Sequence, residues 1–333
     1  MRFLVLLLSL HCFADSSAQT LRKRTLLLMG ARFDITIVAK DSLTAEQHID
    51  TCIAEIKRIE YLISDWIDTT QIGRVNKNAG IQPVWVTEEV IRLALRAKWL
   101  SEITNGAFDI SFAAMEKIWF FDGSMTEMPS KQAVVSAREK VGYQNIIIDT
   151  ARSTIFLKQP GMKIGFGALG EGYAADRCKE IMMQKGVVAG IVNGSGDMNT
   201  WGTQPDGSPW NIGITSPFQR NKLYAVVPLK EGAVVTSGSY EKYAEFNGKR
   251  YSHIINPATG YPATGLTSVT VFGPSAELAN GFSTSMMVLG RRKGMRLLKR
   301  FPAYSCIMIT DKRKFYYSNN LDLSRYKKIV ATN

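Results

Sequence analysis

A histidine, two prolines and a glycine share one short loop late in the chain. His253 opens the stretch HIINPATGYP, which also holds Pro257, Gly260 and Pro262. The prolines fix φ and the glycine permits positive φ, so we expect a rigid, sharply shaped loop. Functional residues are often carried on such loops, so His253 is a candidate for chemistry, although composition alone favours the bland alternative. The alternative is a structural turn that carries a surface histidine.

Three oxygen-bearing side chains are spaced to share one face of a helix. A helix is predicted to begin at Ser275, and Glu277, Asn280 and Thr284 stand at positions i, i+3 and i+7 within it. This spacing places their side chains on the same side of the helix.

A glycine-rich segment precedes another predicted helix. Gly165, Gly167, Gly170 and Gly172 let backbone N–H groups approach an anion at the positive end of that helix. The G-x-G-x-x-G spacing at 165–170 is not a dinucleotide-binding fingerprint, because the acidic partner and the βαβ context are missing.

The remaining pattern predicts the elements that position these residues. Strands are expected at 187–192, at 210–214 and over 25–39 with an interruption, and hairpins at 145–164 and around Asn247-Gly248. Helices are expected from Thr44 as part of a capping box, from Thr87 and from Ser275. The fold class predicted is α+β: mixed, largely antiparallel sheets packed with helices, in two lobes that enclose a ligand.

Composition excludes several classes of protein. The chain has 333 residues with 45% hydrophobic and 21% charged residues, which is typical of a globular protein and not of a disordered one. The net charge of +12 comes from scattered residues, and no nucleic-acid-binding motif accompanies it. Apart from Cys12, the cysteines are Cys52, Cys178 and Cys306, without a C-x-x-C, so neither a disulfide framework nor a thiolate metal site is predicted.

The N-terminus predicts export. Residues 1–18 combine an early arginine, a short apolar run and a small-residue end at Ala18, which is typical of a signal peptide. Cys12 follows the bulky His11, so lipoprotein anchoring is not expected. No later segment reaches the roughly 18 apolar residues of a membrane-spanning helix.

Three stretches in order resemble the ApbE family, the periplasmic FAD:protein FMN transferases. SGSYEKY at 237–243, the His253 stretch and ANGFST at 279–284 are similar to the family patterns S-G-[DS]-Y-E-[RK]-Y, H-I-[IV]-D-P-x-T-G-x-P and A-D-A-x-[AS]-T. Similar matches occur at Met29-Gly30, SDW at 64–66, GAFDIS at 106–111, the segment 165–176 and NGSGD at 193–197. The resemblance implies a signal peptide at 1–18, an ApbE-like (T-fold-related) domain at 19–333 and a periplasmic location.

The resemblance also implies roles for individual residues. His253 would be catalytic. FAD, the substrate, would contact Met29, Trp66, Ala107, Phe108, Asp109, Glu171 and Ile255. Mg²⁺ would be bound by the carbonyl of Ala168 and by Glu277, Asn280 and Thr284.

Three positions depart from the family pattern by losing an aspartate: Gly165, Asn256 and Asn280. We hypothesise that Glu277 restores the charge lost at Asn280. The expected activity is Mg²⁺-dependent transfer of the FMN part of FAD to a Thr or Ser hydroxyl of an acceptor flavoprotein, with release of AMP. Two alternatives stay open, a catalytically weakened FAD-binding protein of the same fold and an FAD pyrophosphatase.

Overall fold

The computed structural model describes residues 19–115, 118–219, 222–325 and 327–328. The predicted signal peptide lies outside the described residues. Within these ranges, no helix combines the length and the apolar character needed to cross a membrane.

An eight-stranded sheet forms the centre of the molecule, and every neighbouring pair in it is antiparallel. The segment predicted as one interrupted strand is a hairpin, because Met29 and Gly30 adopt φ of 54° and 70° and reverse the chain. The strands, in spatial order, are β1 (Thr20–Leu28), β2 (Ala31–Ala39), β6 (Ala189–Gly194), β7 (Asp197–Trp201), β10 (Gly232–Gly238), β15 (Leu266–Gly273), β16 (Ser305–Thr310) and β17 (Phe315–Tyr317).

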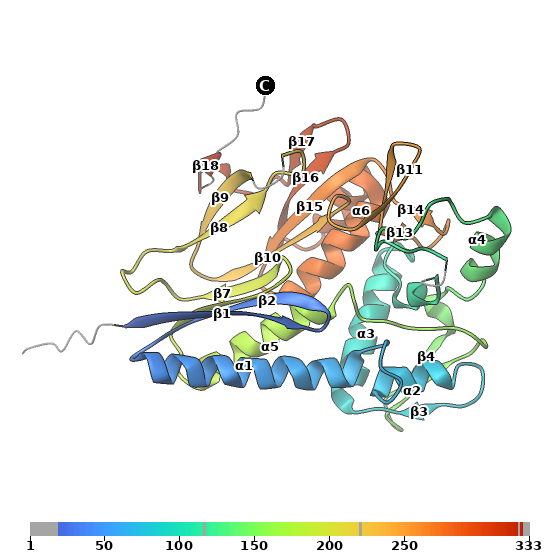
Figure 1. Cartoon of the computed structure of the whole chain (residues 1–333), viewed down its shortest axis with the longest axis horizontal. Coiled ribbons are helices and arrows are strands. Elements are labelled where there is room, and N and C mark those ends of the chain that lie inside the picture. The colour runs from blue at the N-terminus through green and yellow to red at the C-terminus, as the bar shows by residue number, and fades with distance from the viewer. Residues whose placement is uncertain (1–18, 116–117, 220–221, 326, 329–333) are drawn as a thin grey trace, which may run out of the picture.

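Three helices cover one face of this sheet: α1 (Ser42–Ile63), α5 (Gly170–Gln184) and α6 (Ala276–Leu298) (Figure 1). The predicted apolar stripe of α1 is buried against β1, β2 and α5. The predicted capping box at Thr44 is wrong: Asp41 is the N-cap, and its carboxylate accepts a hydrogen bond from the backbone N–H of Thr44. The helix therefore begins at Ser42, one residue after the cap.

A small sheet covers the opposite face. Its order is β18 (Lys327–Lys328), β9 (Leu223–Leu229) and β8 (Trp210–Thr215). In β8 every second residue is buried, so Trp210, Ile212 and Ile214 pack towards the large sheet, as the period of a strand requires. This part of the molecule has three layers: helices, large sheet and small sheet.

The rest of the chain lies beside these layers (Figure 1). It includes two short hairpins next to the end of β10, and the second of them carries the predicted Pro257–Pro262 loop. Its elements are α2 (Gln71–Lys77), β3 (Val84–Trp85), α3 (Glu88–Ile103), the 3₁₀ turns Ile110–Met115 and Tyr143–Asn145, α4 (Lys131–Arg138), β4 (Ile146–Asp149), β5 (Thr154–Leu157), β11 (Tyr243–Phe246), β12 (Lys249–Ser252), β13 (Ile255–Asn256) and β14 (Tyr261–Pro262). A third 3₁₀ turn, Leu323–Arg325, comes shortly before β18.

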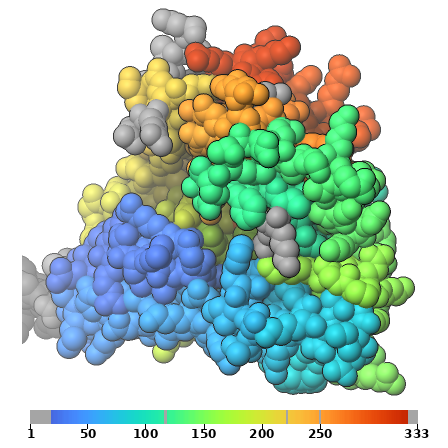
Figure 2. All heavy atoms as spheres, turned by 45° about the vertical axis from the view of Figure 1, so that its right-hand side comes forward, coloured from blue at the N-terminus to red at the C-terminus, as the bar shows by residue number. Residues whose placement is uncertain are grey.

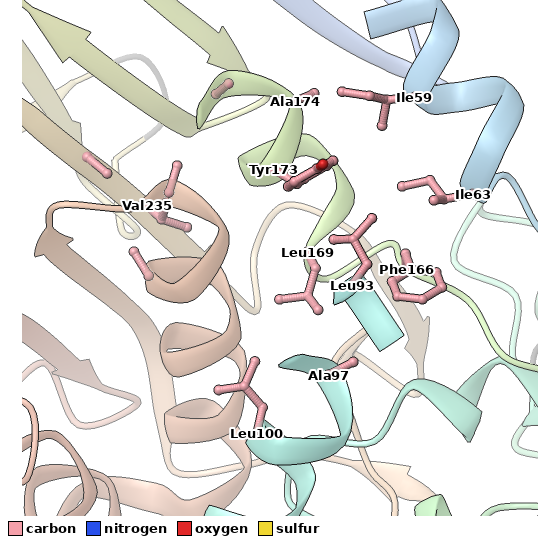
Figure 3. Packing of buried hydrophobic residues seen from close by; sticks show 14 of the residues in the cluster. Ile59, Ile63, Leu93, Ala97, Leu100, Phe166, Leu169, Tyr173, Ala174 and Val235 are labelled. Carbon is pink, nitrogen blue, oxygen red and sulfur yellow. The ribbon is translucent and has the colours of Figure 1, made fainter. Parts of the chain in front are cut away.

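One hydrophobic core connects these two parts. Figure 3 shows Ile59 and Ile63 of α1, Leu93 and Leu100 of α3 and Leu169 between α3 and α5. The predictions of a mixed α+β class, of the hairpins at 146–157 and 243–252, and of helices that begin after Thr87 and Ser275 are confirmed.

Candidate functional site

The N-terminal ends of α5 and α6 are joined by one carboxylate. Asp176 of α5 accepts hydrogen bonds from the backbone N–H groups of Ala276 at 2.8 Å and Glu277 at 3.1 Å, and from the hydroxyl of Ser275 at 2.7 Å. The helices approach so closely that a Cβ added at Gly172 would lie 2.6 Å from the carbonyl oxygen of Ala276. This junction fixes the face of α6 that carries the predicted metal-binding residues.

Two of those residues contact each other and a buried aspartate from the large sheet. The side-chain amide of Asn280 donates to the carboxylate of Asp197 at the start of β7. Thr284 donates to the amide oxygen of Asn280 at 3.2 Å, and the hydroxyl of Ser237 lies 3.3 Å from that of Thr284. Oxygen donors of this kind are the ligands that Mg²⁺ prefers, so the donor set fits a magnesium ion.

The other two predicted metal-binding residues, Glu277 and Ala168, make different side-chain contacts. Glu277 forms an ion pair of 2.6 Å with Arg96 of α3, and its side chain is 7% exposed. Ala168 is half-buried and packs against the core. Among the residues that the structure describes, no group of three or more His, Cys, Asp or Glu side chains is arranged to hold a metal ion.

Three carboxylates, which we call the acid cluster, interact electrostatically: Glu171 on the first turn of α5, Asp197, and Glu241 after β10. Burial raises the pKa of Glu171 to about 7, opposed by the charge of Lys242. Burial and then the charge of Glu171 raise the pKa of Glu241 to about 7. Burial, followed by the charges of the other two carboxylates, raises the pKa of Asp197 well above its ordinary value. Bringing these groups together without a cation is therefore unfavourable.

The side chains of Glu241 and Lys242 are exposed to solvent, while protein close to the carboxylate of Glu241 raises its pKa. We call the position in front of these two residues the recess. Figure 2 shows a hollow between the N-terminal hairpin (blue) and the green region of the chain, and the orange region lies above it.

His253 is held at this recess by the main chain. Its backbone N–H donates to the carbonyl oxygen of Lys242 at 3.1 Å, and its Nδ1 lies 3.0 Å from the same oxygen. Because a carbonyl oxygen only accepts, Nδ1 carries the proton and Nε2 is left with its lone pair. Burial lowers the pKa of His253, with the charge of Lys242 acting in the same direction, and this favours the neutral ring. The ring of Phe121 packs against it, edge to face, at 6.3 Å.

The predicted flavin contacts fall into two groups. The accessible ones are Trp66, which is 76% exposed, and Met29, which is partly exposed. The side chain of Met29 reaches Gly170, the neighbour of Glu171: its Cε lies 3.2 Å from the position that a Cβ of residue 170 would take. An exposed indole is a suitable platform for a flat aromatic ring. Lys163 places its ammonium 4.8 Å from the centre of that indole.

The side chains of the second group are buried. Ala107, Phe108 and Ile255 are each less than 9% exposed. Asp109 already uses both carboxylate oxygens, one for the N–H and hydroxyl of Ser111 and the other for the N–H of Tyr143. Burial raises its pKa despite these hydrogen bonds. Asp109 thus shapes its own loop, and only the backbone of 107–109 is left for ligand contacts.

The structure thus brings together Glu171, Asn280, Thr284 and His253 through hydrogen bonds and electrostatic interactions, with Asp197, Glu241 and Lys242 as intermediates. Sequence reasoning had not assigned roles to Asp197 and Glu241. Their positions could have indicated a role, because Asp197 ends the matched stretch NGSGD and Glu241 lies within the matched stretch SGSYEKY.

Comparison with known proteins identifies the family of this chain. The model of the ApbE family matches residues 29–308. A protein of Klebsiella pneumoniae named FAD:protein FMN transferase is 31% identical over 277 residues, covering 81% of this chain and 79% of the relative. A protein of Salmonella typhimurium with the same name is 31% identical over 293 residues, covering 86% and 83%.

Solved structures give the same result. The ApbE protein of Thermotoga maritima superposes with a TM-score of 0.84 at 27% identity, covering 92% of this chain and 99% of that one. The apo form of the Pseudomonas stutzeri flavinyl transferase ApbE gives a TM-score of 0.78 at 28% identity, covering 90% and 94%. The predictions of the family and of an enzyme of the transferase class are confirmed. The chain belongs to the ApbE family.

Proposed function

We propose that this protein is an FAD:protein FMN transferase that moves the FMN part of FAD to a Thr or Ser hydroxyl of an acceptor flavoprotein and releases AMP. The observation that carries the proposal is a series of hydrogen bonds and electrostatic interactions that links Thr284 through Asn280 and the acid cluster to Lys242 and His253. It places oxygen donors for a cation and a neutral imidazole around one recess, which is what phosphoryl transfer to a hydroxyl requires.

His253 acts as the general base. Nε2 takes the proton of the acceptor hydroxyl while the hydroxyl oxygen attacks the phosphorus of the FMN portion. The phosphoanhydride bond of FAD breaks as the new phosphoester forms, and AMP leaves with the electron pair of the broken bond. The hydrogen bond from Nδ1–H to the carbonyl of Lys242 orients the ring, and its lowered pKa keeps it able to accept a proton at neutral pH.

Mg²⁺ would be held by Thr284, Asn280 and the nearby carboxylate of Asp197, with the carbonyl of Ala168 as a further donor. When bound, it neutralises charge on the diphosphate of FAD. Asn280 keeps an oxygen donor but lacks a negative charge, and Asp197 lies in direct contact with it to provide that charge. The carboxylate of Glu277 is paired with Arg96, so Asp197 and not Glu277 supplies the negative charge in this proposal.

The proposed location is the periplasm. The signal-peptide pattern of residues 1–18 supports export.

For the flavin ring of FAD, the proposed contacts are Trp66 and Met29, the two accessible side chains of the predicted set.

The second candidate is a catalytically weakened FAD-binding protein. The side chain of Asn280 favours this candidate, because its amide N–H₂ donates to Asp197, whereas an aspartate at this position would offer a cation a second charged oxygen ligand. One assay separates the candidates. The mature protein is incubated with FAD, Mg²⁺ and a peptide domain that carries an acceptor threonine, and flavin fluorescence in a denaturing gel and AMP are both measured. Fluorescent acceptor with AMP supports transfer, AMP alone indicates a pyrophosphatase, and bound FAD without either product indicates a binding protein.

A further inference from the structure

Gly165 stands where the ApbE pattern has an aspartate, and the space next to it is filled by another carboxylate. A Cβ added at Gly165 would lie 3.0 Å from Oδ2 of Asp65, 3.2 Å from its Cγ and 3.2 Å from the Cβ of Ala113. The first of these distances is at the limit of what real Cβ atoms tolerate. Asp65 comes from the loop between α1 and α2, one hundred residues earlier in the chain.

The carboxylate of Asp65 is largely buried yet only partly satisfied. Its side chain is 10% exposed. Lys163 forms an ion pair with Oδ2 at 3.1 Å, but the same oxygen receives no well-directed hydrogen bond. A buried carboxylate oxygen without a directed donor is uncommon in folded proteins, since leaving it so costs free energy. Asp65 therefore retains capacity to accept a hydrogen bond.

The surroundings of Asp65 point to an aromatic ligand. The next residue, Trp66, is the exposed indole, and the ammonium of Lys163 lies over its ring while it pairs with Asp65. A flat ring stacked on this face of Trp66 would take the place of the ammonium, which sits on a flexible stem. The carboxylate of Asp65, from the residue before Trp66, would then be available to the edge of the ring. The flavin offers hydrogen-bond donors there, the ring N–H and the ribityl hydroxyls.

We propose that Asp65 is the flavin-binding carboxylate of this protein and replaces, from the opposite side of the site, the aspartate that the ApbE pattern has at position 165. Glycine at position 165 leaves room for Asp65, because a side chain there would press against its carboxylate. The inference rests on the proposed function, since it identifies a contact of the same substrate.

The test is an exchange of the carboxylate between the two positions. FAD affinity is measured by titration calorimetry, with Mg²⁺ and without an acceptor protein, for the wild type, Asp65→Ala, Gly165→Asp and the double variant. Asp65→Ala should weaken FAD binding about 10- to 100-fold, the range for a hydrogen bond to a charged group. Gly165→Asp alone should also weaken binding, because its carboxylate would press against that of Asp65. The FAD affinity of the double variant should lie within about threefold of the wild-type affinity, because the new carboxylate at position 165 takes the place of the one removed at position 65. Such non-additive effects are expected for two residues in contact.

Asp68→Ala is the matched control, because Asp68 is on the same loop but its side chain is 70% exposed. If Asp65→Ala does not fold by circular dichroism, Asp65→Asn keeps the shape and removes only the charge. Wild-type affinity in the Asp65 variants, or a double variant that binds no better than Asp65→Ala, would overturn the inference while leaving the proposed function intact. A wild type that binds no FAD would overturn both.

Discussion

Neutralising one member of the acid cluster should stabilise the protein in the absence of ligand. In Glu171→Gln the side chain keeps its size and loses its charge. Burial raises the pKa of Glu171 from 4.5 to about 7, and the charge of Lys242 opposes this shift. Between these pH values the folded protein holds a proton that the unfolded chain has released. The free energy of unfolding therefore falls as the pH rises from 4.5 to 7.

The size of the effect follows from the shift. A displacement from 4.5 to about 7 corresponds to at most about 3 kcal/mol at 1.36 kcal/mol per pKa unit. Glu171 is half-buried, and solvent screening reduces this limit, so we expect about 1 to 2 kcal/mol. Glu171→Gln should gain this stability above pH 7 and almost none below pH 4.5, where the wild-type side chain is already neutral.

Urea denaturation of both proteins at pH 5 and pH 8, without FAD and Mg²⁺, measures the difference. Glu102→Gln on the exposed side of α3 is the matched control and should change stability by less than about 0.5 kcal/mol at both pH values. A Glu171→Gln variant that is no more stable than the wild type at pH 8, or that gains equally at both pH values, would refute the electrostatic account of the site.

Three other changes test the site. His253→Ala should lower the rate of AMP release about 100- to 10,000-fold while leaving the calorimetric affinity for FAD nearly unchanged, and a proportional loss of affinity would contradict its role as a base. Asn280→Asp should lower the free energy of unfolding without Mg²⁺ by about 1 kcal/mol, because it sets a second carboxylate against Asp197, and should strengthen Mg²⁺ binding in calorimetry. Unchanged Mg²⁺ affinity would show that position 280 does not limit the cation site. Glu277→Gln should lower the free energy of unfolding by about 1 kcal/mol, because the ion pair with Arg96 is lost. Its Mg²⁺ affinity should stay within about twofold of the wild type, and a larger loss would indicate that Glu277 binds the metal.

Local patterns predicted several helices and hairpins and two residues of α6, Asn280 and Thr284, that meet in the site. Helical spacing placed Asn280 and Thr284 on one face, and the structure joins them by a hydrogen bond. The same spacing placed Glu277 on that face, but its longer side chain reaches Arg96 on α3. No local pattern reveals such a partner, because the two residues are 181 positions apart.

Long-range placement also explains the residues that sequence reasoning missed. Asp197 becomes part of the site only because β7 pairs with β10, next to α6. Asp65 meets Gly165 only after the α1–α2 loop packs against the glycine-rich segment. The capping error at the start of α1 has a local cause, since Asp41 and Thr44 are both acceptable caps and the carboxylate of Asp41 accepts the hydrogen bond from the N–H of Thr44.

The Nδ1–H group of His253 is held by a main-chain carbonyl oxygen, that of Lys242, and every amino acid has such an atom. Many enzymes fix the tautomer of such a base with a carboxylate side chain, which a single codon change removes. Here a peptide oxygen does this, and its position depends on the path of the chain through the turn after β10 and on the pairing of β11 with β12. Mutation at position 242 therefore alters the local charge without changing which nitrogen is free, and during evolution the charge around this site can drift while the base keeps its orientation.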